Sequence, residues 1–171
     1  PLPHRPSSCT PCHCIPGVLR AEGGRCPFRG KDITTASAHK ICKLGIARTF
    51  QIVQVISDMT VLENVMTGTY LRTYNRSQVQ EKAEEILRFT GLHEKRNSLG
   101  TDLTIADKKR LEVGMALGTQ PTLLMLDDAM SGRTPVELRD RVALVRKIRE
   151  TGVTRIILEH ATQEVSALWD R

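Results

Sequence analysis

A strand–helix–strand pattern in the second half of the chain constrains the fold more than any other feature. Leu123–Leu126 is an uninterrupted apolar run of strand length, and Ile156–Leu158 is a second one. Between them, Thr134–Glu137 supplies a helix cap, a proline at the first helical position and a glutamate at the third, and Gly152 ends the helical stretch. Two apolar strands joined by one helix form a parallel pair with both faces covered. The sequence therefore predicts an α/β fold built on a parallel sheet.

The first half of the chain predicts smaller elements beside that sheet. Residues 25–29 read as a short strand, after which Gly30 turns the chain into residues 31–33. Thr35 or Ser37 is placed to cap a short helix that reaches Leu44, and Ile46–Phe50 follows as a further strand.

Capping signals predict three helices in the middle of the chain, each with an apolar stripe at helical spacing. The caps are Thr60 for a helix from Val61, Ser77 with Gln80 for a helix over 78–90 that Gly91 ends, and Thr104 with Asp107 for a helix to about Gly118.

Composition excludes several classes of protein. Hydrophobic residues make up 40% and charged residues 26% of the chain, as in ordinary globular domains, and no apolar run approaches the length of a membrane span. The net charge is +6, but the basic residues are dispersed and aromatic residues make up only 4%. Base-stacking platforms are therefore not expected, and we expect no nucleic acid among the partners.

The cysteines near the N-terminus raise the alternative of a zinc site. Cys9 and Cys12 have zinc-ligand spacing, but no second pair follows at the customary distance. The frequent prolines of residues 1–13 give no helix or strand period, so an irregular leader, native or not, is the preferred interpretation.

Acidic residues and a histidine follow the two apolar strands. Asp127-Asp128 ends the first strand and Glu159-His160 ends the second. The carboxyl ends of parallel strands meet at one edge of a sheet, where ligands bind, and carboxylates suit Mg²⁺ together with substrate phosphates. An acidic pair is also an ordinary helix cap, so the residues by themselves leave both interpretations open.

The order of these motifs resembles the ATP-binding-cassette ATPase family over about residues 16–171. The segments 44–51 and 60–65 look particularly like the ATP-binding subunits of bacterial branched-chain amino-acid importers. The motifs that carry the resemblance are Gln51 after a strand, Leu103–Asp107 at a helix start, Leu123–Asp128, Ser131–Pro135 and Glu159-His160.

The resemblance implies a role for each matching residue. Gln51 matches the Q-loop glutamine, which senses Mg²⁺ and the attacking water beside the transporter contact. Asp127 matches the Walker B aspartate, which holds Mg²⁺ through water, and Asp128 stands where the family usually has the glutamate that polarises the attacking water. His160 matches the switch histidine. The expected nucleotide contacts are Thr104, Ile105, Ala106 and Asp107 of the signature motif, together with Ser131.

Several positions depart from the family pattern. The usual signature is Leu-Ser-Gly-Gly-Gln, whereas residues 104–107 are Thr-Ile-Ala-Asp, so Asp107 adds a negative charge where phosphate is expected. The carboxylate of Asp128 is one methylene short, which predicts slow hydrolysis. Arg155 falls inside an expected buried strand and must reach an edge or find a partner.

The phosphate loop, GxxxxGK[ST], is missing. The only Gly-Lys pair is Gly30-Lys31, where the pattern fails. Because the chain begins with Pro1 and lacks this loop, we expect a fragment that binds ATP weakly or not at all by itself. The expected division is a leader over 1–13 and a partial ATPase domain over 14–171, with a helical subdomain at about 52–102 and the signature helix to switch histidine at 103–160.

The fold class that the resemblance implies is an incomplete P-loop-NTPase-like parallel sheet with a helical subdomain. It implies an ATPase subunit that uses ATP and Mg²⁺ to drive amino-acid import, with a second ATPase subunit and membrane permease subunits as partners. Such a subunit lies peripherally on the cytoplasmic face of the inner membrane. The alternatives are a degenerate, non-hydrolysing interaction module and, third, a zinc- or nucleic-acid-binding protein.

Overall fold

The computed structural model describes residues 14–17, 23–50, 52–127 and 135–158. Its central element is a three-stranded parallel sheet in the order β3 (Ile46–Arg48), β4 (Leu123–Asp127) and β5 (Thr154–Leu158). The helix α6 (Pro135–Glu150) connects β4 to β5. The predicted strand–helix–strand unit and the α/β fold are therefore confirmed.

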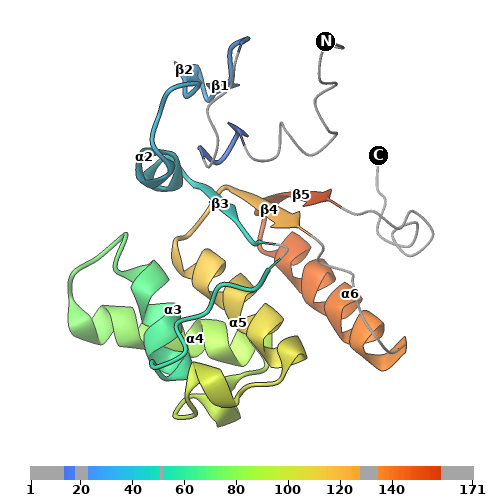
Figure 1. The fold of residues 1–171 in the computed structure, drawn as a ribbon. Coiled ribbons are helices and arrows are strands. Elements are labelled where there is room, and N and C mark those ends of the chain that lie inside the picture. The colour runs from blue at the N-terminus through green and yellow to red at the C-terminus, as the bar shows by residue number, and fades with distance from the viewer. Residues whose placement is uncertain (1–13, 18–22, 51, 128–134, 159–171) are drawn as a thin grey trace, which may run out of the picture.

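Two helices cover one face of this sheet (Figure 1). They are α6 and α5 (Ile105–Gly118), which pack on side chains of β3 and β4. Full burial stabilises each large apolar side chain by about 1.5–3 kcal/mol, so this layer is a main source of stability for the sheet. Its buried residues are Ala47, Ala116, Leu124, Leu126, Val145 and Ile148.

The opposite face is covered by smaller elements, the helix α2 (Ala38–Lys43) and the hairpin of β1 (Pro27–Phe28) and β2 (Lys31–Asp32) (Figure 1). The two turn residues, Arg29 and Gly30, have φ angles of 50° and 74°. Two consecutive positive φ angles match the twist of a two-residue hairpin and strongly favour glycine. The buried residues of this face are Ile33, Ile41, Ile46 and Met125.

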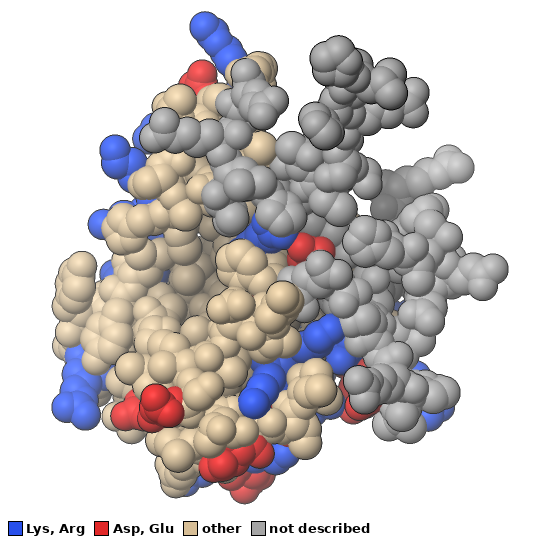
Figure 2. Space-filling model, in the orientation of Figure 1, with Lys and Arg blue, Asp and Glu red and all other residues tan. Residues whose placement is uncertain are grey.

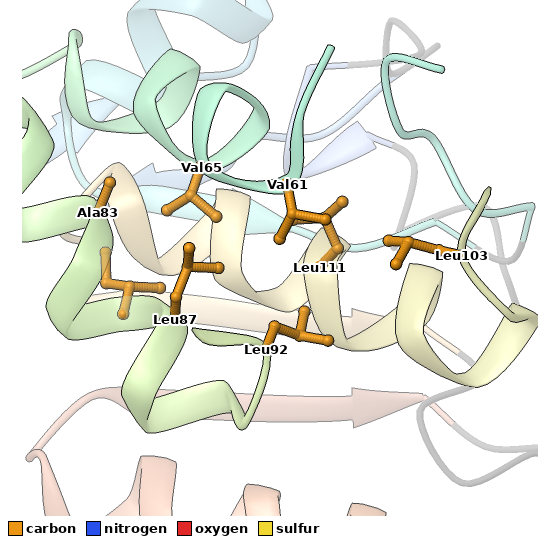
Figure 3. Packing of buried hydrophobic residues seen from close by; sticks show 8 residues of the cluster. Val61, Val65, Ala83, Leu87, Leu92, Leu103 and Leu111 are labelled. Carbon is orange, nitrogen blue, oxygen red and sulfur yellow. The ribbon is translucent and has the colours of Figure 1, made fainter. Parts of the chain in front are cut away.

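A separate apolar core holds α5 together with α3 (Val61–Thr69) and α4 (Arg76–Thr90), as Figure 3 shows. The close approach of α3 to α5 depends on Gly68, because a Cβ there would lie 2.2 Å from the carbonyl oxygen of Met115. Two 3₁₀ turns follow α4, η1 (His93–Lys95) and η2 (Gly100–Asp102). The core residues include Val61, Val65, Ala83, Leu87, Leu92, Leu103 and Leu111.

Of the three helix starts predicted for the middle of the chain, two are confirmed and one is wrong. Thr60 forms a full capping box with Glu63, and the Thr104 hydroxyl accepts the N–H of Asp107. The helix expected over 78–90 instead begins at Arg76. Its cap is Asn75, whose Oδ1 accepts the N–H groups of Ser77 and Gln78, so Ser77 lies inside the first turn. Asparagine caps as well as serine does, and the earlier cap adds two residues to the helix.

Two expectations about the strands are also resolved. The strand predicted to reach Phe50 ends at Arg48, because the Phe50 N–H donates to the side chain of Glu112. Arg155 lies in β5, a terminal strand of the sheet that the structure describes, and its side chain is half-buried. The expectation that Arg155 reaches a sheet edge agrees with this placement.

The described surface carries mixed charge. Figure 2 shows its lysine and arginine side chains scattered among acidic and uncharged ones, without a continuous basic band on this face.

None of the helices in the described ranges combines the length and hydrophobicity that a membrane crossing requires.

Candidate functional site

The carboxyl ends of the parallel strands β4 and β5 meet at one edge of the sheet. Asp127 is the last residue of β4, and it pairs in register with Leu158, the last residue of β5. The segment after β3 approaches the same point, because the Thr49 N–H donates to the carbonyl of Met125 and the Thr49 hydroxyl accepts the N–H of Asp127. Asp127 is therefore held at the edge where α/β proteins bind ligands.

The carboxylate of Asp127 is fixed by a buried arginine. Arg48 Nη2 lies 2.6 Å from Asp127 Oδ2, and the two side chains are 3% and 15% exposed. The guanidinium also lies over the ring of Phe50, 5.3 Å from its centroid. Removing one partner of such a buried pair costs about 3–5 kcal/mol, because the other charge then remains buried without a counter-ion.

The surroundings of Asp127 fit Mg²⁺ that is held mainly by other oxygens. Mg²⁺ in nucleotide sites keeps several waters and takes only one or two carboxylates together with phosphate oxygens. Arg48 contacts Oδ2 of Asp127. No group of three or more His, Cys, Asp or Glu side chains in the described ranges is arranged to hold a metal ion by itself. Asp127 would hold such a metal together with waters and phosphate oxygens.

Glu112 of α5 is a site residue that the sequence interpretation missed. Its side chain is buried, and Oε1 accepts the Phe50 N–H at 2.8 Å. Burial raises the pKa of Glu112 to about 7, although the N–H groups of Phe50 and Gln54 and the charge of Lys109 act to lower it. The available signal was a single charged residue in the otherwise uncharged stretch 111–118.

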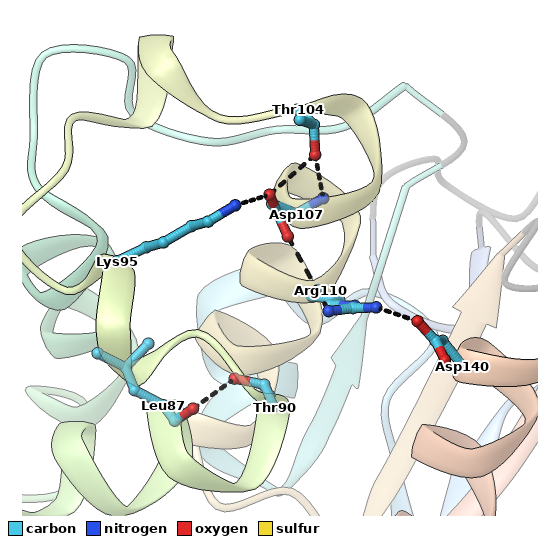
Figure 4. Close-up of polar contacts among 7 residues, drawn as sticks. All are labelled: Leu87, Thr90, Lys95, Thr104, Asp107, Arg110 and Asp140. Atoms are coloured by element: carbon cyan, nitrogen blue, oxygen red, sulfur yellow. Dashed lines mark hydrogen bonds and ion pairs between the residues drawn. The ribbon is translucent and has the colours of Figure 1, made fainter. Parts of the chain in front are cut away.

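The predicted signature residues lie at the N-terminus of α5, where Thr104 is the cap (Figure 4). The Thr104 hydroxyl accepts the Asp107 N–H at 3.2 Å and donates to Asp107 Oδ2 at 2.9 Å. Thr104 and Ile105 are exposed, and Ala106 is half-buried. The first turn of this helix is therefore accessible, and the unpaired N–H groups and dipole of a helix start favour an anion.

Asp107 does not present an isolated negative charge. Lys95 and Arg110 both pair with its carboxylate, and Arg110 also contacts Asp140 of α6 at 2.7 Å (Figure 4). Partial burial acts to raise the pKa of Asp107, but the hydrogen bonds from Lys95 and Thr104 and the two positive charges outweigh it, so the pKa lies below its ordinary value. The two cations offset the charge that the sequence places beside the expected phosphate.

A small cavity lies between the strand end and the signature helix. Its volume is about 40 Å³, and Asp127, Glu112 and Ala106 contribute to its lining. Ligand pockets usually measure about 300–1,000 Å³, so this cavity has room for a few waters and not for a nucleotide. A nucleotide would have to contact these residues from the exposed edge.

The structure describes part of the predicted site. It places Asp127 and Thr104, Ile105, Ala106 and Asp107, whereas Gln51, Asp128, Ser131 and His160 lie outside the described residues. Gly30-Lys31 belongs to the β1–β2 hairpin rather than to a loop between a strand and a helix. The zinc candidates Cys9 and Cys12 also lie outside the described residues, and the other cysteines, Cys14, Cys26 and Cys42, are free thiols.

Comparisons with known proteins agree on one family. A family model described as ABC transporter matches residues 9–131. The chain is 34% identical to a probable branched-chain amino acid transport ATP-binding protein LivG of Archaeoglobus fulgidus, over 85% of this chain and 62% of that protein. It is 30% identical to the high-affinity branched-chain amino acid transport ATP-binding protein LivG of Escherichia coli K12, over 99% of this chain and 72% of that protein. The chain thus spans about two thirds of the length of these relatives.

Solved structures give the same result. The fold superposes on a nucleotide-free ATP-binding cassette from an ABC transporter with a TM-score of 0.81 and 30% identity, and the match covers 94% of this chain and 69% of that one.

Proposed function

The chain belongs to the ABC transporter family, and we propose on this premise that it is part of an ATPase subunit that powers the import of branched-chain amino acids. The observation that carries the proposal is the placement of Asp127. Its carboxylate ends the buried strand of a parallel sheet and is fixed at the carboxyl edge by Arg48. Relatives named as branched-chain amino acid transport proteins support the choice of substrate class.

In this proposal, ATP hydrolysis depends on positioning and electrostatics, with little covalent chemistry for the protein to perform. Bound Mg²⁺ supplies positive charge that neutralises the phosphate oxygens. Asp127 would hold the metal, and Arg48 holds the Asp127 carboxylate in one geometry. Asp128 polarises the attacking water, His160 contacts the terminal phosphate, and Gln51 senses both the water and the metal.

The signature residues act on a second subunit's nucleotide. Thr104, Ile105, Ala106 and Asp107 form an exposed helix start that is suited to an anion. Lys95 and Arg110 supply the positive charge that makes Asp107 compatible with a phosphate nearby. The proposed assembly is therefore a dimer of ATPase subunits, in which Ser131 is a further nucleotide contact.

The proposed permease partner fits an apolar surface next to position 51. Large hydrophobic side chains are exposed in the segment between β3 and α3, and Ile52 is the most exposed of them at 77%. The Gly100 N–H donates to the carbonyl of Met59, which brings the exposed Leu99 close to this segment. A permease contact here would keep the subunit at the cytoplasmic face of the inner membrane. The residues of this surface are Ile52, Ile56, Met59 and Leu99.

Nucleotide binding measured with and without a phosphate loop tests the proposal. The chain by itself, which has no GxxxxGK[ST] pattern, is expected to bind Mg-ATP more weakly than about 1 mM. The same chain extended at its N-terminus by a phosphate-loop segment is expected to bind in the micromolar range, about 8 kcal/mol. Micromolar affinity of the unextended chain would contradict the need for that loop.

The same measurement separates the proposal from a second candidate, a non-hydrolysing interaction module. That candidate is favoured by Asp128, whose carboxylate is one methylene shorter than the usual glutamate. Failure of the extended chain to bind Mg-ATP, together with intact folding by circular dichroism, would contradict the ATPase proposal and support the module.

A further inference from the structure

The segment from Phe50 to Thr60 crosses from the sheet to the helices and contains position 51. Two buried polar side chains, Glu112 and Asn64, hydrogen-bond to the backbone of this segment near its two ends. Both belong to the helical bundle, Glu112 to α5 and Asn64 to α3. Side chains thus fasten the connection to the helices near its two ends, and backbone hydrogen bonds to residues 99–101 hold its last residues as well.

Glu112 holds the end of the segment that is nearer the sheet. Its side chain is 6% exposed, and Oε1 accepts the Phe50 N–H at 2.8 Å. The backbone N–H of Gln54 also acts to lower the pKa of this carboxyl, so it lies near the same group. Phe50 and Gln54 lie on either side of position 51, so one carboxylate hydrogen-bonds to the backbone before it and lies near the backbone after it.

Asn64 holds the other end. It is fully buried, and Oδ1 accepts the Ile56 N–H at 2.8 Å. Its amide nitrogen lies 2.9–3.2 Å from the carbonyl oxygens of Ile56, Met59 and Thr60. Between the two anchors, the side chain of Ile52 is 77% exposed, so apolar burial at that position does not fix the segment.

A carboxylate at position 112 has a physical reason. The strand stops at Arg48, so the Phe50 N–H has no strand partner, and an N–H that is partly shielded from water is costly to leave without an acceptor. An ionisable acceptor inside the protein is costly as well, and packing on its own would favour an apolar residue. The hydrogen bond from Phe50 explains why a buried acid occupies this position of α5.

We propose that Glu112 is a positioning residue, whose buried carboxylate fixes the backbone at Phe50, next to position 51, to the helix that begins at Thr104. The inference rests on the proposed function for the role of Gln51, because the backbone that precedes this residue is then held by the helix that carries the signature residues. Glu112 lies five residues beyond Asp107 on the same helix, about 7.5 Å along its axis at 1.5 Å per residue.

Amide hydrogen exchange of the full chain, read residue by residue by NMR, tests the inference. The variant Glu112→Met keeps the length of the side chain but cannot accept hydrogen bonds, whereas Glu112→Gln keeps one acceptor oxygen. We expect the Phe50 amide to exchange at least tenfold faster in Glu112→Met and within about threefold of wild type in Glu112→Gln, following the loss or retention of its partner. The matched control is Glu85→Met, at an exposed position of α4, which should leave the Phe50 amide unchanged.

Rescue by glutamine separates positioning from packing. If Glu112→Met retains the protection of the Phe50 amide, position 112 only fills space and the inference is wrong. If Glu112→Gln loses that protection while amides of α4 keep theirs, the inference is also wrong. Should Glu112→Met fail to fold, the glutamine variant still decides by the same criterion.

The test uses no nucleotide, so its failure is distinguishable from failure of the proposed function. Loss of the exchange effect would overturn the role of Glu112 and leave the ATPase proposal unchanged. Failure of the loop-extended chain to bind Mg-ATP would contradict the ATPase proposal. The role of Glu112 in fixing the segment to α5 would still be supported by the exchange data.

Discussion

The first turn and the middle of α5 each carry an acidic side chain, and the pKa values of the two are shifted in opposite directions. At the first turn, Asp107 pairs with Lys95 and Arg110, and its pKa lies below the ordinary value despite partial burial. In the middle, Glu112 is buried against the sheet, and burial raises its pKa to about 7. Two acids a few residues apart on one helix thus differ in the direction of their pKa shifts, because cations and hydrogen bonds outweigh burial at Asp107, whereas burial outweighs them at Glu112.

The contrast separates two kinds of polar contact. The ion pairs at the first turn offset the charge of Asp107 at an accessible helix start, where salt screens them and water competes for the same charged groups. Contacts in the middle fix backbone and side chains at the strand ends, where an unpaired group is costly. Substitutions should therefore have large effects at the buried end and small ones at the exposed end.

The largest effect is expected at Arg48, the buried counter-ion of Asp127. Arg48→Met leaves Asp127 without its partner and should lower the free energy of unfolding by about 3–5 kcal/mol. The control is Arg88→Met, which breaks the exposed pair with Glu84 and should cost less than about 1 kcal/mol. Urea denaturation measures both, and equal losses would remove the distinction between buried and exposed pairs.

The next effect concerns pH. The folded-state pKa of Glu112 is about 7 against an ordinary value of 4.5, so the native protein binds more protons than the unfolded chain between these values. Its contribution to stability is therefore present at low pH and is lost as pH rises through 7. Charged groups near this carboxyl are Lys109 and Asp127, and Arg110 and Arg141 line the same cavity.

Glu112→Gln removes this dependence. Relative to wild type, the variant should gain on the order of 2–3 kcal/mol in unfolding free energy between pH 5 and pH 8, since one pKa unit corresponds to about 1.4 kcal/mol. Urea midpoints measured across this range provide the comparison. Parallel pH curves for the two proteins would show that Glu112 titrates at its ordinary pKa.

A smaller effect of opposite pH sense is expected for Asp107. Its lowered pKa means that its contribution is present above the ordinary value of 3.8 and is lost as pH falls through the folded-state pKa. Asp107→Asn should cost about 1 kcal/mol at pH 7 through the weakened cap and ion pairs, and less below pH 4. Thermal unfolding at the two pH values tests this, and a cost that grows in acid would contradict it.

The smallest effect is expected at Lys95, whose side chain is half-exposed beside Asp107. Lys95→Met should change the unfolding free energy by no more than about 0.5 kcal/mol, and 0.5 M salt should reduce the difference further. A loss of unfolding free energy above about 2 kcal/mol that does not depend on salt would show that this pair contributes as much as a buried contact.

Local patterns in the sequence predicted much of the fold. The apolar runs of β4 and β5, the helix between them and the caps at Thr60 and Thr104 are each specified by residues that lie near one another in the chain. The wrong cap at Ser77 shows the limit, because Asn75 offered an equally good cap two residues earlier and sequence spacing does not rank the two.

The candidate site was less predictable because its contacts are distant in sequence. Asp127 was identified from its place after a strand, but its partner Arg48 lies 79 residues away. Glu112 meets Phe50 across 62 residues, and no local spacing indicates that contact. The placements of Gln51, Asp128, Ser131 and His160 stay predictions.

The most direct test of the central claim, that Asp127 is the metal-binding acid of a Mg-ATP site at this sheet edge, is Mg²⁺-dependent ATP hydrolysis by the loop-extended chain. Asp127→Asn should lower the rate on the order of 10²-fold or more, as expected when a preorganised electrostatic group is lost, while Asp58→Asn at an exposed position should leave it unchanged. Equal Mg²⁺-dependent hydrolysis by wild type and Asp127→Asn would contradict the account.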